Sequence, residues 1–216
     1  MIQKKFVVVF AIAIVLTACA TSRGVLDLKV PDVANPTSSQ VVKITSVTDK
    51  LVFEIKPKKP SIPSLQNDEI NDPTITRRAV ARKRNGFGAA LGDILLPEGQ
   101  TVEQLTHSAL VNALRDSGYS VVAAGEPGYD SATPVSAEIQ LFWSWMTPGF
   151  WEFKLRYNAK IQLNGDWPLK GENRIVKGDA RFAGAFASSP EWRELIDNGI
   201  ADLITNVKAM LKRASS

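Results

Sequence analysis

Residues 151–163 alternate between apolar and polar side chains more regularly than any other part of this sequence. Successive side chains of a β-strand point to opposite faces of its sheet, so a period of two predicts a strand with one buried and one solvated face. The apolar positions are Trp151, Phe153, Leu155, Tyr157, Ala159, Ile161 and Leu163, and the polar positions are Glu152, Lys154, Arg156, Asn158, Lys160 and Gln162.

Patterns on both sides of this strand predict an antiparallel meander. Residues 135–145 alternate in the same way, and Thr147-Pro148-Gly149 separates them from the central strand. Asn164-Gly165 is a hairpin-type turn, and a third strand is expected from about 174 to 186. Because one face of this meander is apolar and the other charged, we expect helices to cover only one face.

Two amphipathic segments can provide that cover. The first begins at Thr101, which has capping-box spacing to Gln104, and it ends at Gly118. The second begins at Ser189-Pro190, with Ser189 as the cap, and keeps apolar residues at helical spacing to Leu211. We expect both to pack on the sheet; the alternative for the second is an amphipathic helix lying on a membrane.

Two further strands are expected earlier in the chain, over Val41–Val47 and Leu51–Lys56, the second ended by the prolines of Pro57–Pro63. The predicted fold class is therefore α+β. It has an antiparallel-rich sheet with two helices packed on one face, preceded by a lipoprotein signal peptide and a flexible tether.

The N-terminus has the layout of an export signal. Lys4 and Lys5 precede an unbroken apolar run of eleven residues, Phe6–Leu16, which is too short to span a bilayer. The run ends in Leu16-Thr17-Ala18-Cys19, which reads as a lipobox, and Cys19 is the only cysteine in the chain. We expect diacylglycerol and an N-acyl chain on Cys19 and no other cofactor. An ordinary secretory signal and an uncleaved anchor are the alternatives.

These features divide the chain into three parts. Residues 1–18 are the signal peptide, 19–40 the lipidated N-terminus and tether, and 41–216 a single periplasmic domain. Turn and linker residues indicate the tether, although Val25 to Val30 could add an edge strand. Ala20, rather than Asp, follows the cysteine. By resemblance to lipoproteins of Gram-negative bacteria, in which an Asp at this position tends to retain the protein at the inner membrane, we expect the outer membrane, with the protein facing the periplasm. In a Gram-positive cell the protein would lie outside the cytoplasmic membrane instead.

A basic run precedes a glycine-containing turn in the middle of the chain. It holds Arg77, Arg78, Arg82, Lys83 and Arg84, and Gly86-Phe87-Gly88 follows. It lacks the Gly-Lys-Ser/Thr ending of a P-loop. One interpretation is a solvated loop with a structural turn. The other is contact with anionic lipid headgroups, lipopolysaccharide phosphates or an acidic partner.

Net charge gives no support for a nucleic-acid partner. The formal charge of +4 falls to +2 (4 − 2) when Lys4 and Lys5 leave with the signal peptide. We therefore expect a membrane, reached through the lipid anchor, and an envelope protein or lipid as partners.

Aromatic residues gather at the tip of the first hairpin. Strict alternation places Trp143, Trp145 and Trp151 on the core face beneath the helices, with Phe142, Met146 and Phe150 on the opposite face. Either these residues close the edge of the core, or Phe142, Met146 and Phe150 form an exposed patch that docks a partner or enters headgroups.

Catalytic chemistry is poorly represented. His107 is the only histidine, and no nucleophile, orienting base or zinc-ligand pattern accompanies it. We predict that the chain is not an enzyme and holds no metal.

Several short motifs together are similar to a known family. They are the lipobox, Ser-Val-Thr-Asp at Ser46–Asp49, Arg-Asn-Gly-Phe-Gly at Arg84–Gly88, and Gly118-Tyr119 after the first helix. With the meander and the final helix, they resemble YajG-type lipoproteins of Gram-negative bacteria, a family without established enzymatic activity or catalytic residues. The Pro-Lys-Lys-Pro and Arg-Lys-Arg stretches are more basic than the general pattern requires.

The resemblance and the lipobox imply a non-catalytic, lipid-anchored envelope lipoprotein. It would bind or scaffold partners at the periplasmic face of the outer membrane. The alternative is an accessory subunit of an envelope transport, secretion or flagellar machine.

Overall fold

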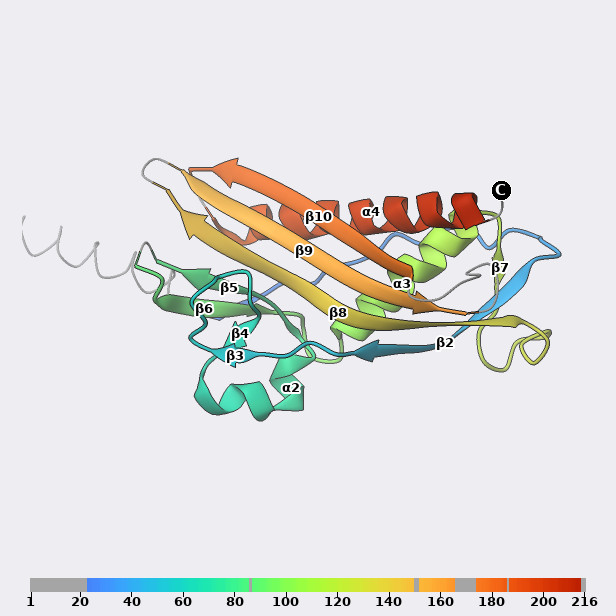
Figure 1. Cartoon of the computed structure of the whole chain (residues 1–216), viewed down its shortest axis with the longest axis horizontal. Helices are drawn as coiled ribbons and strands as arrows, with labels where there is room; N and C mark the ends of the chain where they lie inside the picture. The colour runs from blue at the N-terminus through green and yellow to red at the C-terminus, as the bar shows by residue number, and fades with distance from the viewer. Residues whose placement is uncertain (1–22, 86, 150–151, 166–173, 186, 215–216) are drawn as a thin grey trace, which may run out of the picture.

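The computed structural model describes residues 23–85, 87–149, 152–165, 174–185 and 187–214, so Cys19 and Phe150 lie outside the described residues. One large sheet forms the centre of the molecule, and the helices α3 and α4 cover one of its faces (Figure 1). The predicted α+β fold class, an antiparallel-rich sheet with two helices packed on one face, is confirmed.

The bounds of the elements follow in chain order. The strands are β1 (Gly24–Val25), β2 (Val41–Asp49), β3 (Glu54–Ile55), β4 (Ser64–Leu65), β5 (Ala79–Arg84), β6 (Ala90–Leu95), β7 (Ser120–Val121), β8 (Thr133–Pro148), β9 (Phe153–Asn164) and β10 (Arg174–Gly184). The helices are the 3₁₀ helix η1 (Asn67–Asn71), α2 (Pro73–Thr76), α3 (Val102–Asp116) and α4 (Ser189–Ala214).

The predicted meander is present. Strand β9 pairs antiparallel with β8 on one side and with β10 on the other. On its other edge β8 pairs with two parallel strands, β2 along residues 133–139 and β5 at Ser144 and Trp145. The sheet continues through β6 to β1 beyond β5, and to β7 beyond β2. It therefore mixes antiparallel and parallel pairs.

The first long helix begins as its sequence predicts. The hydroxyl of Thr101 accepts from the backbone N–H of Gln104, whose side chain accepts in return from the backbone N–H of Thr101. In the last helix, the backbone N–H of Trp192 donates to the carbonyl of Ser188. Helical hydrogen bonding therefore starts one residue before the predicted cap at Ser189.

Helix α4 approaches the sheet very closely. A Cβ added to Gly199 would lie 2.0 Å from Cδ1 of Tyr157 on β9, and one added to Gly178 on β10 would lie 2.7 Å from the carbonyl oxygen of Gly199. Phe142 stacks edge-on against the fully buried Tyr157, with ring centroids 5.2 Å apart. Only glycine at these two positions permits this helix–sheet contact.

A β-bulge in β8 reverses the predicted faces at the hairpin. Ile139 pairs with Ile161 but Leu141 pairs with Lys160, so β8 contains one residue more than β9 between these pairs. The extra residue exchanges the two faces of β8 beyond this point. Phe142 and Met146, predicted on the face opposite the helices, are therefore buried at 1% and 4% exposure in the core beneath α3 and α4.

Two tryptophans of β8 lie in a second, smaller core, on the face of the sheet opposite α3 and α4. Trp143 and Trp145 pack there with Leu65, Ala79 and Leu95, and half-buried apolar residues of the segment 51–76 close the cluster. The expectation that only one face is covered therefore fails at this end of the sheet.

The predicted strand Leu51–Lys56 shortens to β3, which pairs with β4 in a separate two-stranded sheet. Phe53 lies outside this strand, and its ring packs edge-on against Trp143, with centroids 5.9 Å apart. Burial of the segment against β8 thus replaces the regular strand pairing that the alternation predicted.

The segment 23–40 packs on the domain, which corrects the predicted tether for these residues. Strand β1 pairs parallel with β6 at the sheet edge, as the alternative of an edge strand allowed. Leu26 and Leu28 are 2% and 0% exposed in the main core. The polar composition of the segment concealed this burial, because hydrogen bonds from Gln100, Asn112 and Arg115 to its backbone hold it in place together with the two leucines.

Candidate functional site

The basic run is a strand and not the predicted solvated loop. Residues 79–84 form β5, between β6 and β8, and Arg82 and Arg84 are only 5% and 8% exposed. Strand β5 lies inside the sheet, and the cores that pack on the sheet bury its side chains, which sequence charge alone does not reveal. Arg82 and Arg84 therefore do not lie in an exposed loop, and the contact of the five cations with an anionic surface or partner stays a prediction.

The five cations separate into different environments. Arg77 is exposed and its Nε lies 3.2 Å from a carboxylate oxygen of Glu103. Arg78 is half-buried and its Nε donates to the carbonyl of Leu96 at 2.9 Å. Neither residue lines the pocket to which Arg82 and Arg84 belong.

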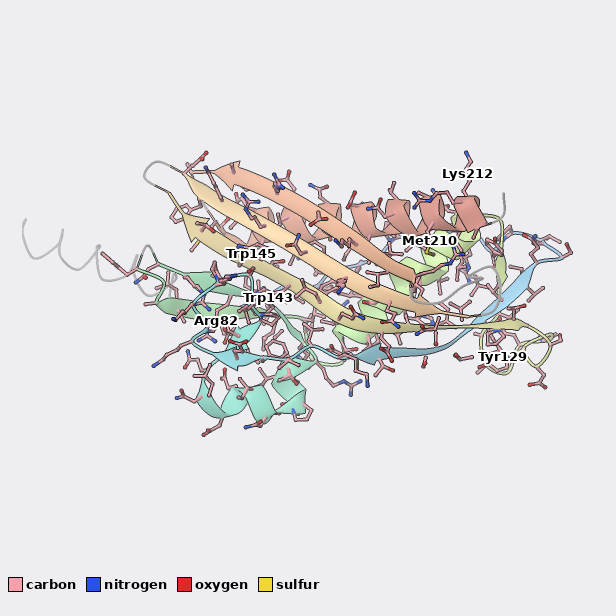
Figure 2. The ribbon with its side chains drawn as sticks, in the orientation of Figure 1. Arg82, Tyr129, Trp143, Trp145, Met210 and Lys212 are labelled. Atoms are coloured by element: carbon pink, nitrogen blue, oxygen red, sulfur yellow. The ribbon has the colours of Figure 1, made fainter. Side chains whose placement is uncertain are left out.

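Arg82 and Arg84 line a pocket of about 670 Å³ between β5 and the β3–β4 segment. Lys56 and Lys58 contribute to its wall from the segment before β4, and Leu65 and Phe87 give it apolar surface. Figure 2 shows Arg82 near Trp143 and Trp145, at the same end of the molecule as β3 and β4. We call this hollow the arginine pocket.

The charge of the arginine pocket is one-sided. Its described lining includes four cationic residues and no Asp or Glu. Burial lowers the pKa of Arg84, and the neighbouring charge of Arg82 lowers it further. Asp93 lies behind the wall, with one carboxylate oxygen 3.4 Å from Nη1 of Arg82 and the other 3.2 Å from Nη2 of Arg23.

The two buried arginines have incomplete hydrogen bonding. Arg84 donates to the hydroxyl of Ser64 at 2.9 Å and to the carbonyl of Gly88 at 3.1 Å, but its Nε makes no hydrogen bond among the described residues. Nη1 of Arg82 makes no hydrogen bond within that part of the chain either, although it forms the ion pair with Asp93. Buried unsatisfied donors are costly, so they indicate a place where a further acceptor can bind.

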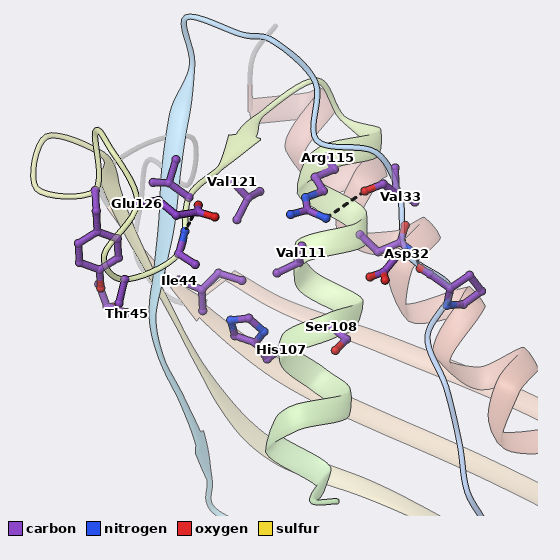
Figure 3. A pocket seen from close by; sticks show the side chains of 16 residues that line it. Asp32, Val33, Ile44, Thr45, His107, Ser108, Val111, Arg115, Val121 and Glu126 are labelled. Carbon is purple, nitrogen blue, oxygen red and sulfur yellow. Dashed lines mark hydrogen bonds between the residues drawn. The ribbon is translucent and has the colours of Figure 1, made fainter.

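A second hollow lies toward the opposite end of the molecule, where Figure 2 labels Tyr129. It has a volume of about 500 Å³ and lies between β2, α3 and the segment 31–33 (Figure 3). Its charged lining is mixed, with Asp32, Arg115 and Glu126.

His107 lines this second hollow but has no catalytic partner. Partial burial lowers its pKa below the usual value for histidine. Among the described residues no hydrogen bond or ion pair joins its imidazole to another side chain, so no nucleophile and base are brought together here. Arg115 is engaged through Nη1 with the carbonyl of Val33 at 3.0 Å.

No group of three metal-ligating side chains is found in the part of the chain that the structure describes. Across the same residues, no helix has the length and apolar character needed to cross a membrane.

Comparison with known proteins adds no family. No family profile matches the chain, and no curated protein matches it. One solved structure that resembles it is described only as the crystal structure of an uncharacterized protein. It is 11% identical, has a TM-score of 0.44, and the alignment covers 87% of this chain and 97% of that one.

The remaining predicted site residues lie either in the core or outside the described residues. Phe142 and Met146 belong to the core, so the hypothesis of an exposed docking patch is wrong for them, while Cys19 and Phe150 lie outside the described residues. Sequence reasoning missed Lys56 and Lys58 as site residues. The signal available for Lys58 was the excess of charge in Pro-Lys-Lys-Pro, which begins directly after Lys56 and which the fold brings beside Arg82 and Arg84.

Proposed function

We propose that this chain is a non-catalytic, lipid-anchored envelope lipoprotein that binds partners at the periplasmic face of the outer membrane. The lipobox ending in Cys19 carries the proposal. The cationic arginine pocket supports a binding role, and the lone histidine without a catalytic partner is in keeping with a non-catalytic one.

The short distance along the chain between Cys19 and the domain gives the proposal a spatial consequence. Strand β1 starts at Gly24, five residues after the cysteine. Five extended residues span at most about 18 Å. A lipidated Cys19 would therefore hold the β1 edge of the sheet near the headgroups, rather than at the end of the long tether that the sequence predicted.

Acylation can be tested directly in cells. With labelled palmitate, we expect the wild-type chain to carry label and to sediment with outer membranes, because each buried CH₂ of an acyl chain adds about 0.8 kcal/mol of membrane affinity. Cys19→Ser should carry no label and should become extractable without detergent. Retention of label by Cys19→Ser would refute the anchor.

A further inference from the structure

The arginine pocket combines a cationic floor with guanidinium donors that make no hydrogen bond among the described residues. Arg82 and Arg84 are more than nine-tenths buried, and each has a guanidinium nitrogen without a hydrogen bond among the described residues. A guanidinium presents its donors in a planar fork that matches the oxygens of a phosphate or a carboxylate. The floor is therefore built for an oxyanion.

The number of positive charges favours phosphate over a single carboxylate. Lys56 and Lys58 add two ammonium groups to the pocket wall. Asp93 offsets part of the charge of Arg82 from behind, but it also pairs with Arg23. A phosphate group, with more charge and more acceptor oxygens than a carboxylate, can engage several of these cations at once.

The backbone around the pocket is also unusual. Lys56 and Asn67, both in the lining, are the described non-glycine residues with positive φ, at 51° and 27°. Such conformations cost energy and concentrate at ligand-binding positions. The fold thus maintains an unfavourable backbone geometry in the wall of this hollow.

Apolar side chains lie beside the cationic floor and indicate an amphiphilic ligand. Phe87 is 98% exposed and Ile55 is 49% exposed, and both line the pocket. A phenylalanine fully exposed to water has no structural role in the described core. Beside a phosphate site, it can contact the apolar part of the same molecule or enter the interfacial region of a bilayer.

The pocket also lies close to the point where the chain would leave the membrane. Arg23 bonds to both Asp93 and Glu69, and Asp93 pairs with Arg82 of the pocket. Arg23 is only four residues after Cys19. Lipidation would therefore place this pocket near headgroups, whereas the second hollow lies toward the other end of the molecule (Figure 2).

We infer that the arginine pocket binds the phosphate group of an anionic lipid headgroup, held by Arg82 and Arg84 with Lys56 and Lys58 at the wall and Phe87 beside the acyl region. The lipid as source of the phosphate rests on the proposed anchoring at Cys19. The affinity of the pocket for phosphate does not rest on that anchoring.

The test uses the mature chain carrying Cys19→Ser, which retains every described residue and has no acyl chain. Its binding to vesicles of phosphatidylethanolamine with phosphatidylglycerol is measured by co-flotation, and inorganic phosphate is then added as a competitor. Both arms are independent of acylation, so a negative palmitate experiment would refute the anchor and leave this measurement intact.

The variants separate the pocket from the general basic surface. Arg84→Gln removes charge-assisted donors and should weaken vesicle binding by at least about tenfold. Lys56→Gln and Lys58→Gln are exposed changes that preserve folding and should each weaken it about two- to fivefold. The matched controls are Lys59→Gln on the same segment and Arg77→Gln in the basic run, both exposed and outside the pocket, and both should leave binding unchanged.

Several results would overturn the inference. Unchanged binding in Lys56→Gln and Lys58→Gln would refute it even if Arg84→Gln failed to fold. An equal loss in Lys59→Gln or Arg77→Gln would show diffuse surface attraction instead of a site. Binding of inorganic phosphate without binding to phosphatidylglycerol vesicles would identify a soluble phosphate compound and refute the lipid source.

Discussion

Gly199 and Tyr157 show how one side chain can determine a helix–sheet distance. The carbon that an alanine would add at position 199 would lie 2.0 Å from the ring of Tyr157, which is fully buried and is held by Phe142. In an exposed helix interior, alanine is about 1 kcal/mol more favourable than glycine. Here the ring cannot move aside without displacing its neighbours.

We therefore predict that Gly199→Ala destabilises the protein, by about 1–3 kcal/mol or more, as is typical of overpacked cores. The measurement is the free energy of unfolding from urea denaturation. Asn198→Ala, at the neighbouring exposed position of α4, is the control and should change little. Equal stability of Gly199→Ala and wild type would mean that α4 is not seated against Tyr157 as described.

Asp49, at the end of β2, links folding to pH. Burial raises its pKa from 3.8 to about 6, although the backbone N–H of Leu51 donates to the carboxylate. The folded chain thus binds this proton more tightly than the unfolded chain does. The resulting stabilisation is fully present below pH 3.8 and is lost as pH rises through about 6.

Asp49→Asn should remove this dependence, because its amide oxygen can still accept from Leu51 but carries no charge. We expect the variant to gain stability over wild type as pH rises from about 4 to about 7, with little difference at the acidic end. Urea denaturation of both proteins across this range measures the difference. A constant difference at all pH values would contradict a raised pKa.

At the scale of elements, the bulge in β8 decides which side chains enter which core. Up to Ile139 the apolar residues of β8 face the helices, and beyond Leu141 Phe142 and Met146 do so instead. Strict alternation assigned the opposite faces to this half of the strand. A bulge adds one residue at a single point of a strand, so hydrophobic patterning alone does not locate it.

Deletion of Gln140 would remove the bulge without exchanging the faces of β8, because the residue pairs on both sides of the bulge would then follow one strict alternation. Deletion of Ser144, beyond the bulge, would instead turn Trp145 toward α3 and α4 and Met146 toward the second core. We predict that the first variant retains cooperative thermal unfolding, measured by circular dichroism, and loses only the hydrogen bond to Gln162. The second variant should lose the cooperative transition. A Ser144 deletion that melts like wild type would show that the register is not fixed here.

Elements with local signals were predictable from the sequence, and those fixed by distant contacts were not. The capping box at Thr101 and the alternation along β9 are local, and both are present as predicted. The position of β5 depends on β8, which is distant in sequence, so a solvated loop was one of the two interpretations of the five cations. The arginine pocket escaped prediction for the same reason, since Lys58 and Arg84 meet only in the fold.

At the scale of the whole molecule, the segment 23–40 joins parts that are otherwise far apart. It begins at Arg23, bonded to Asp93 beside the arginine pocket. It then places Leu26 and Leu28 in the core, and near its end Asn35 exchanges two hydrogen bonds with the backbone of Val121, beside the second hollow. The segment thus runs between the regions of the two hollows as a strap.

This strap changes what is expected of a truncated chain. From the sequence, a fragment starting at Gln40 should fold alone because the apolar elements lie beyond it. Removal of the strap would instead expose the core around Leu26 and Leu28 to water. Truncating a single buried leucine to alanine typically costs about 2–5 kcal/mol. Since a domain is stable by only about 5–15 kcal/mol, a chain of residues 40–216 should be close to unfolded.

The comparison is between chains starting at Gly24 and at Gln40, both followed by thermal denaturation. We expect a cooperative transition for the first and a strongly lowered Tm, or none, for the second. Within the longer chain, Leu28→Ala should reproduce much of the loss, whereas Val25→Ala, at a side chain that is 56% exposed, should change little. Equal Tm values for the two fragments would support the flexible tether that the sequence predicted. A lowered Tm would mean that a lipid anchor at Cys19 is attached to the folded domain by only a few residues, which would restrict how the domain can turn above a membrane.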